Sequence, residues 1–292
     1  MKLPVPAGRF HKISSASKFN MILGSPSKKI HIYHKAKDKK VVQKSIEGRG
    51  LGFGVAALQR PNGKFIFASI KSYPKDKKDT VKVVFYDSEG EIISILDSGN
   101  PYRRRGTDIT LKNATNGEVF AFIDNGSIRI YRSIDLKTWK FVQEIRGAGK
   151  TSLNKDGSLI IRRLTKTRII AYSLEKGNYI RSFAKNLPEI SGGKSNIAVD
   201  PMGKITNFIL AVATYTGKRG DTQDDINIYR IKLGEVKLIR VLKDSDFPGP
   251  NSYARGRALH FSSDGKALLV GSREFTSIFK MNGFTRSCES SK

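Results

Sequence analysis

The stretch Ile128-Arg129-Ile130-Tyr131 decides the fold, because a pattern of the same kind recurs along the whole chain. Each copy is a short apolar alternation that ends in an aromatic residue, and successive aromatic residues lie 41 to 57 positions apart. Apolar alternation with a period of two residues is typical of β-strands. Six copies at a near-regular spacing therefore predict a repeated β unit. The other five copies are Ile30-His31-Ile32-Tyr33, Val83-Val84-Phe85-Tyr86, Ile169-Ile170-Ala171-Tyr172, Ile226-Asn227-Ile228-Tyr229 and Thr276-Ser277-Ile278-Phe279.

Tight turns flank these copies on both sides. Upstream, Asn-Gly or Asp-Gly dipeptides precede an apolar run, and such dipeptides supply the positive φ angles that a two-residue hairpin needs. Downstream, a second glycine turn leads into another alternating strand, as at Ser88-Glu89-Gly90 and Glu175-Lys176-Gly177. Each repeat thus predicts about four short antiparallel strands, and no segment has a helical period. The upstream dipeptides are Asn62-Gly63, Asn116-Gly117, Asp156-Gly157 and Asp264-Gly265.

Four-stranded units that repeat about every 40–50 residues are typical of a β-propeller. We predict an all-β fold, a single β-propeller domain over residues 1–292, with six four-stranded blades. An N-terminal strand pairing into the last blade, or residues 283–289 completing that blade, would close the ring. A β-sandwich or two smaller β domains are the alternative architecture. The expected blades cover residues 9–48, 49–98, 99–147, 148–187, 188–245 and 246–292.

The stretch from His260 to Ser272 resembles a WD40 repeat, in which a strand, a Ser-x-Asp-Gly turn and a small-residue strand end recur. The six aromatic positions fall where that family places Trp before Asp. The chain departs from the family pattern: no Gly-His pair opens a repeat, Trp139 is its only Trp, and only Tyr86-Asp87 keeps the acidic partner. The resemblance covers nearly the whole chain and implies a WD40-like propeller, with a seven-bladed ring of that type as the alternative to six blades.

The composition describes a strongly basic globular domain. Of 292 residues, 53 are Lys or Arg and 26 are Asp or Glu, which gives a formal net charge of +27. The single cysteine, Cys288, excludes an internal disulfide and a cysteine-based zinc cluster. No apolar run approaches the roughly 20 residues of a membrane-spanning helix, and the segment Met1–Leu23 lacks the apolar core of a signal peptide. We expect an intracellular protein of the cytoplasm or the nucleus, without a transmembrane segment.

Motifs for cofactors and metals are incomplete. The stretch from Gly147 to Thr151 resembles the end of a phosphate-binding loop, but Glu144 stands where the motif needs glycine, and a strand follows instead of a helix. The glycine-rich stretch 48–54 has the wrong spacing for a dinucleotide site. The four histidines form no convincing metal triad, and the acidic cluster at residues 221–225 is a solvated loop, a cation site or a contact for a basic partner. We therefore expect no cofactor and no metal.

The predicted topology separates the charge onto two faces. Loops joining strands 2 and 3 of a blade, and loops joining one blade to the next, emerge on one face, which carries most of the excess positive charge. Lysine and arginine on such a face would contact phosphates. Loop tyrosines 73, 102, 215 and 253 could stack on unpaired bases. The predicted contact residues are Arg103, Arg104, Arg105, Lys150, Arg162, Arg163, Lys166, Lys218, Arg219, Arg255 and Arg257.

The resulting hypothesis is a non-catalytic WD40-like β-propeller that serves as a binding platform. Its basic face would engage an anionic macromolecule, namely RNA, an acidic protein surface or a larger nucleoprotein assembly. One alternative is a protein–protein interaction scaffold with no nucleic-acid role, in which the charge serves solubility or binds an acidic peptide. The other is a metal-dependent propeller hydrolase, which needs inward-facing acidic or histidine side chains on several innermost strands. A proteome-wide lysine bias is a separate explanation of the charge itself.

Overall fold

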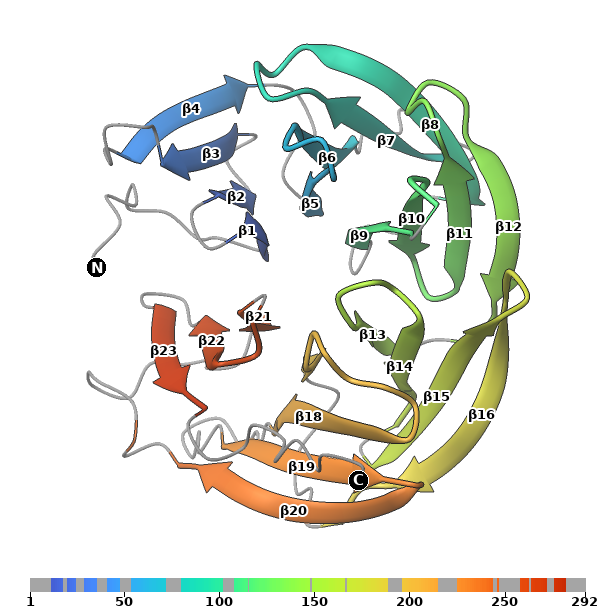
Figure 1. Ribbon diagram of the computed structural model, residues 1–292, viewed down its shortest axis with the longest axis vertical. Helices are drawn as coiled ribbons and strands as arrows, with labels where there is room; N and C mark the ends of the chain where they lie inside the picture. The colour runs from blue at the N-terminus through green and yellow to red at the C-terminus, as the bar shows by residue number, and fades with distance from the viewer. Residues whose placement is uncertain are drawn as a thin grey trace, which may run out of the picture.

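The computed structural model describes most of the repeat units and parts of the segments between them. The described residues are 12–17, 20–24, 29–35, 41–47, 54–71, 80–101, 108–114, 116–147, 149–165, 167–188, 196–214, 225–243, 246, 258–262, 264–271 and 276–281. Over these ranges the long regular elements are all β-strands, and they form sheets whose strands are consecutive in the chain and antiparallel. Figure 1 shows the sheets arranged around a common centre, with β1, β5, β9, β13 and β21 innermost.

Five sheets have four strands each, and we call them blades 1 to 5. Blade 1 comprises β1 (Lys12–Ser17), β2 (Asn20–Gly24), β3 (Lys29–Lys35) and β4 (Val41–Glu47). Blade 2 comprises β5 (Val55–Gln59), β6 (Phe65–Lys71), β7 (Thr80–Tyr86) and β8 (Ile92–Pro101). Blade 3 comprises β9 (Asp108–Asn113), β10 (Val119–Asp124), β11 (Ile128–Ser133) and β12 (Lys140–Ile145). Blade 4 comprises β13 (Lys150–Leu153), β14 (Leu159–Arg163), β15 (Arg168–Glu175) and β16 (Asn178–Asn186). Blade 5 comprises β17 (Ile197–Val199), β18 (Asn207–Ala213), β19 (Ile226–Lys232) and β20 (Glu235–Leu242).

The last sheet corrects the predicted blade count. It contains β21 (Ala258–Phe261), β22 (Ala267–Gly271) and β23 (Thr276–Lys280), and no fourth strand among the described residues. The prediction of six four-stranded blades, or of a seven-bladed ring, is therefore wrong: the described residues form five four-stranded blades and one three-stranded sheet. In blades 2 and 4 a turn and an apolar alternation follow the aromatic residue, whereas the sequence after Phe279 soon becomes polar. The two segments expected to close the ring, before Lys12 and at residues 283–289, lie outside the described residues.

The predicted hairpin turns are confirmed where the structure describes them. Asn62-Gly63 joins β5 to β6, and Asp156-Gly157 joins β13 to β14. Gly63 has a φ of 80°, a conformation that glycine adopts without steric cost. In the WD40-like stretch, the Ser262 hydroxyl donates to Asp264 Oδ1 at 2.6 Å, and the Ala267 amide donates to the Ser262 hydroxyl at 2.9 Å. The side chains of this turn thus hold β21 and β22 in register.

The hydrophobic core lies between neighbouring blades. On β11, Ile128 and Ile130 pack toward blade 4, whereas Tyr131 packs in the cluster shared with blade 2. Because side chains alternate across a strand, a blade has two apolar faces, and each face is buried only by the next blade. β1 contacts both β5 and β21, which brings the first and last sheets together around the centre. Packing between sheets therefore holds the ring.

Antiparallel order inside each blade gives the molecule two distinct ends. Connections from the second strand to the third, and from one blade to the next, lie at what we call the junction face. Turns joining the first strand to the second, and the third to the fourth, lie at the hairpin face. Contacts between blades agree with this division: Arg60 Nη2 donates to Gly117 O at 3.0 Å, joining two hairpin-face turns of blades 2 and 3.

Candidate functional site

The sequence predicts eleven residues that contact phosphate at the junction face, and the structure describes only three of them. Lys150 begins β13 and is exposed. Arg162 and Arg163 end β14, and their Cα partners on β13 are Thr151 and Lys150. The remaining predicted contact residues lie outside the described ranges, as do the four loop tyrosines; these residues are Arg103, Arg104, Arg105, Lys166, Lys218, Arg219, Arg255 and Arg257.

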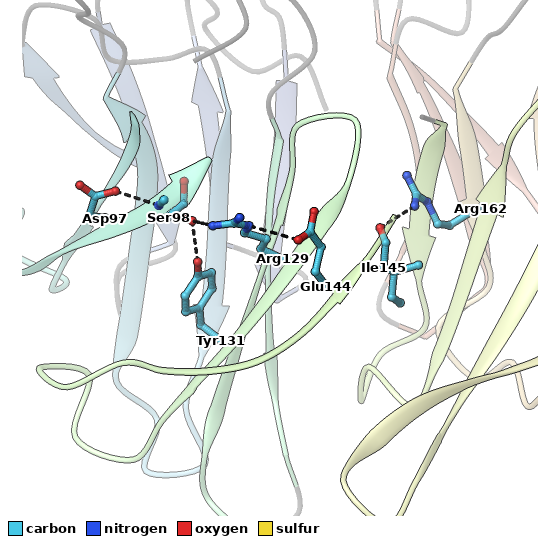
Figure 2. A network of polar contacts seen from close by, with 8 residues as sticks. Asp97, Ser98, Arg129, Tyr131, Glu144, Ile145 and Arg162 are labelled. Atoms are coloured by element: carbon cyan, nitrogen blue, oxygen red, sulfur yellow. Dashed lines mark hydrogen bonds and ion pairs between the residues drawn. The ribbon is translucent and has the colours of Figure 1, made fainter. Parts of the chain in front are cut away.

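Arg162 is completely buried at the junction of blades 3 and 4 (Figure 2). Its Nη1 donates to the carbonyl oxygens of Ile145 at 3.0 Å and Arg146 at 3.2 Å. Its Nη2 donates to Gly126 O at 3.3 Å and also to Gly147 O. Burial lowers the pKa of Arg162, and the charge of Asp124 opposes that shift. The guanidinium group thus joins the β10–β11 turn to the end of β12.

Arg163 has a similar position on the other side of blade 4. It is also fully buried, and its Nη1 donates to Ala213 O of β18 at 3.0 Å. Burial lowers the pKa of Arg163 as well. Both arginines belong to β14 rather than to the loop that follows it, so neither guanidinium is at the surface. Their burial does not fit the predicted phosphate contact, and instead assigns them to the junctions between blades.

A second polar network joins blades 2 and 3, and the sequence analysis did not single it out. Figure 2 shows Arg129 and Tyr131 of β11 converging on the Ser98 carbonyl of β8. Arg129 Nη1 and the Tyr131 hydroxyl each donate to that oxygen at 2.7 Å. Glu144 of β12 lies 3.8 Å from Arg129 Nε, and both side chains are about a quarter exposed. The signal was present in the repeated motif itself, because Arg129 and Tyr131 are its second and fourth residues.

Gly99 allows Arg129 to reach the Ser98 carbonyl. The glycine has a φ of 60°, and a Cβ atom built on it would lie 2.7 Å from Arg129 Nη1. Its amide donates to Asp97 Oδ1 at 2.8 Å, in the part of β8 where the register with β7 shifts. Any side chain at position 99 would displace the guanidinium. This network lies at the junction face, where Arg146 and Lys150 are also exposed.

The described residues show neither a metal centre nor a membrane-spanning helix. No group of three or more His, Cys, Asp or Glu side chains within the described ranges is placed to hold a metal ion. In the same part of the chain, no helix has the length and apolarity needed to cross a bilayer.

Comparison with known proteins identifies the fold. No protein-family model matches the chain, and no curated protein matches it either. Among solved structures, the β-propeller domain of Cps50 (Swd1) from Myceliophteria thermophila matches with a TM-score of 0.58 and 11% sequence identity. The match covers 96% of this chain and 99% of that domain. The chain has a WD40-like β-propeller fold. At this identity the likeness of the propeller to Cps50 concerns the fold alone, and it confirms the resemblance that the Ser262–Asp264 turn and the repeated aromatic motif indicated.

Proposed function

We propose that this WD40-like propeller is a non-catalytic binding platform whose junction face engages an anionic partner, namely RNA or a nucleoprotein assembly. The net charge of +27 is the observation that carries the proposal. A chain with this charge attracts polyanions, and lysine and arginine bind phosphates by charge and by counterion release without a special motif. Such contacts give affinity without reading base sequence.

The position of exposed cations supports the junction face as the binding surface. Exposed lysines and arginines lie at the strand ends of blades 2 to 5 on this face, whereas several turns at the hairpin face carry carboxylates such as Asp87, Glu89 and Asp135. Arg162 and Arg163 are left out of the proposed surface because they are buried. The exposed junction-face cations are Lys82, Arg146, Lys150, Arg168, Lys185, Arg240 and Lys243. Arg103, Arg104, Arg105, Lys166, Lys218, Arg219, Arg255 and Arg257 complete the proposed set.

A salt titration of RNA binding tests this proposal. The test variant replaces Arg146, Lys150 and Arg168 by Ala, and the matched control replaces Lys64, Lys137 and Lys176, which are exposed in turns of the hairpin face. Both variants lose three positive charges. For single-stranded RNA, we expect the negative slope of log affinity against log salt to shrink by about 2 in the test variant, since each phosphate contact contributes about 0.7. The control should keep the wild-type slope.

The same titration shows whether the positive charge acts regardless of its position on the surface. Equal losses in both variants, or binding that vanishes by about 0.15 M salt, would show that the junction face has no special role. A second variant with Arg103, Arg104 and Arg105 replaced by Ala tests the proposed contacts that lie outside the described residues. A duplex RNA measured in parallel separates a preference for unpaired bases from binding to phosphate alone.

A further inference from the structure

An exposed leucine occupies a strained turn at the outer rim of blade 5. Leu233 and Gly234 connect β19 to β20, with φ angles of 48° and 82°. Such angles favour Asn-Gly, and a bulky side chain at positive φ is a steric outlier. The Leu233 side chain is nevertheless 75% exposed, the most exposed large hydrophobic residue among those described. The chain therefore bears both backbone strain and apolar exposure at one position.

Packing explains one comparable leucine but does not explain Leu233. Leu136 also has a positive φ, of 64°, yet it is buried in the core between blades 2 and 3. There, burial of the side chain compensates for the strained backbone. At Leu233 the backbone amide donates to Thr206 O at 2.7 Å, so the turn is held in place while its side chain stays in solvent. A binding role accounts for a residue that costs stability without adding to the core.

Lysines lie on the segments next to the Leu233 turn. Lys232 precedes it, and Asn207 is the Cα partner of Lys232 in the sheet. Lys204 exchanges backbone hydrogen bonds with Asn207, which places Lys204 on the far side of that residue. Lys185 belongs to β16 of blade 4, and its Cε lies 3.4 Å from the position of a Cβ atom on Gly234. Glu235 is the single acidic residue in the turn. The collar of charge around Leu233 is therefore cationic.

We propose that Leu233 is an anchor that inserts into an apolar pocket of a partner protein whose pocket rim carries Asp and Glu side chains. Insertion removes the leucine from water, and rim carboxylates pair with Lys185, Lys204 and Lys232. A rigid hairpin tip suits this role because little conformational freedom is lost on binding. The anchor lies at the rim, in the β19–β20 turn, and shares only Lys185 with the junction-face cations named above. The variants that test the junction face leave Leu233, Lys185, Lys204 and Lys232 unchanged, so either proposal can fail without the other.

The first experiment identifies the partner by photo-cross-linking. A photoreactive phenylalanine replaces Leu233 in the full chain, and a control chain carries it at Ile134, which is 68% exposed in a blade 3 turn. The proposal expects a protein that cross-links at position 233 and not at position 134. A cross-link to RNA, to a second copy of this basic chain, or to no protein at all overturns it.

Titration with the purified cross-linked protein then tests the chemistry. Leu233→Asn should weaken binding about tenfold or more, and Lys204→Glu combined with Lys232→Glu should weaken it further at low salt. The matched control is Lys176→Asn, which occupies the same turn position with a φ of 47° but lies in blade 4. Both Asn variants should melt at or above the wild-type temperature, so unfolding cannot explain a loss of binding. Unchanged affinity in Leu233→Asn, or tighter binding after the charge reversal, would refute the anchor.

Discussion

At the scale of single residues, the buried arginines of β14 are the least expected feature of this protein. A guanidinium group out of water needs partners for its donors, and a carboxylate is the common choice. Arg162 instead uses four backbone carbonyl oxygens from two segments of blade 3. Acidic side chains are scarce in this chain, and main-chain oxygens offer the same acceptors without them.

We expect Arg162→Leu to lower the free energy of unfolding by about 2–4 kcal/mol, because one buried and three partly buried carbonyl oxygens lose their donor. Lys150→Leu serves as the control: Lys150 is exposed on the adjacent strand, so its replacement should change stability by about 0.5 kcal/mol or less. Urea denaturation of both variants measures the difference. A loss below about 1 kcal/mol for Arg162→Leu would show that the carbonyl network contributes little.

The sequence could not place these arginines correctly for a physical reason. In Leu159–Arg163 both faces of the strand are buried, so alternation offers no sign of which side chains face solvent. The positive charge of Arg162 and Arg163 then led to the prediction that both lie in the loop between the second and third strands of the blade. The Asn-Gly and Asp-Gly turns, by contrast, were predictable because their backbone angles restrict the residues allowed there. Arg129 was missed because it donates to a main-chain carbonyl, that of Ser98, and a main-chain acceptor leaves no signal in the sequence of side chains.

At the scale of the strand, the repeated motif carries a contact between blades as well as a core position. Its terminal tyrosine donates to a carbonyl at the end of the preceding blade in two repeats. Tyr131 bonds to Ser98 O, and Tyr229 bonds to Pro188 O, each at 2.7 Å. The aromatic ring fills the interface between blades, and the hydroxyl fixes the position of one blade against the next.

Tyr131→Phe should lower the free energy of unfolding by about 1 kcal/mol, because the ring is kept and one hydrogen bond is lost. Tyr229→Phe should lower it by about 1–2 kcal/mol, because the Tyr229 hydroxyl also accepts a hydrogen bond from Asn227 Nδ2 at 3.0 Å. The two sites lie at different blade junctions, so the double variant should lose about the sum. Tyr172→Phe is the control, since that hydroxyl bonds to no described residue. Guanidinium denaturation provides the values, and a double variant no less stable than either single variant would contradict this account.

At the scale of the whole molecule, the net charge of +27 opposes compaction as well as attracting polyanions. Two ion pairs among the described residues, Arg129–Glu144 and Arg132–Glu118, are long, at 3.8 Å each, and join partly exposed side chains, so they offset little of this repulsion. Stability therefore rests on the apolar clusters between blades and on the hydrogen bonds that join them.

The melting temperature should consequently rise as salt increases from about 0.01 to 0.3 M, since the Debye length falls from about 30 Å to below 10 Å over this range. Differential scanning calorimetry in sodium chloride measures the effect. Sucrose at matched osmolality is the control for solvent exclusion, because it does not screen charge. A melting temperature that stays constant or falls with salt would show that repulsion between the protein's own positive charges does not lower its stability.

The arginine contacts between blades also bear on how such a protein can diverge. Every residue has a carbonyl oxygen, so substitutions at positions 126, 145 and 146 leave the acceptors of Arg162 in place. Related chains could then retain the arginine while its contact positions vary freely, with no correlated acidic partner. An alignment-based search for covarying pairs of positions would therefore miss these contacts. The sequences of the blades could also diverge widely while the blades stay joined in the ring.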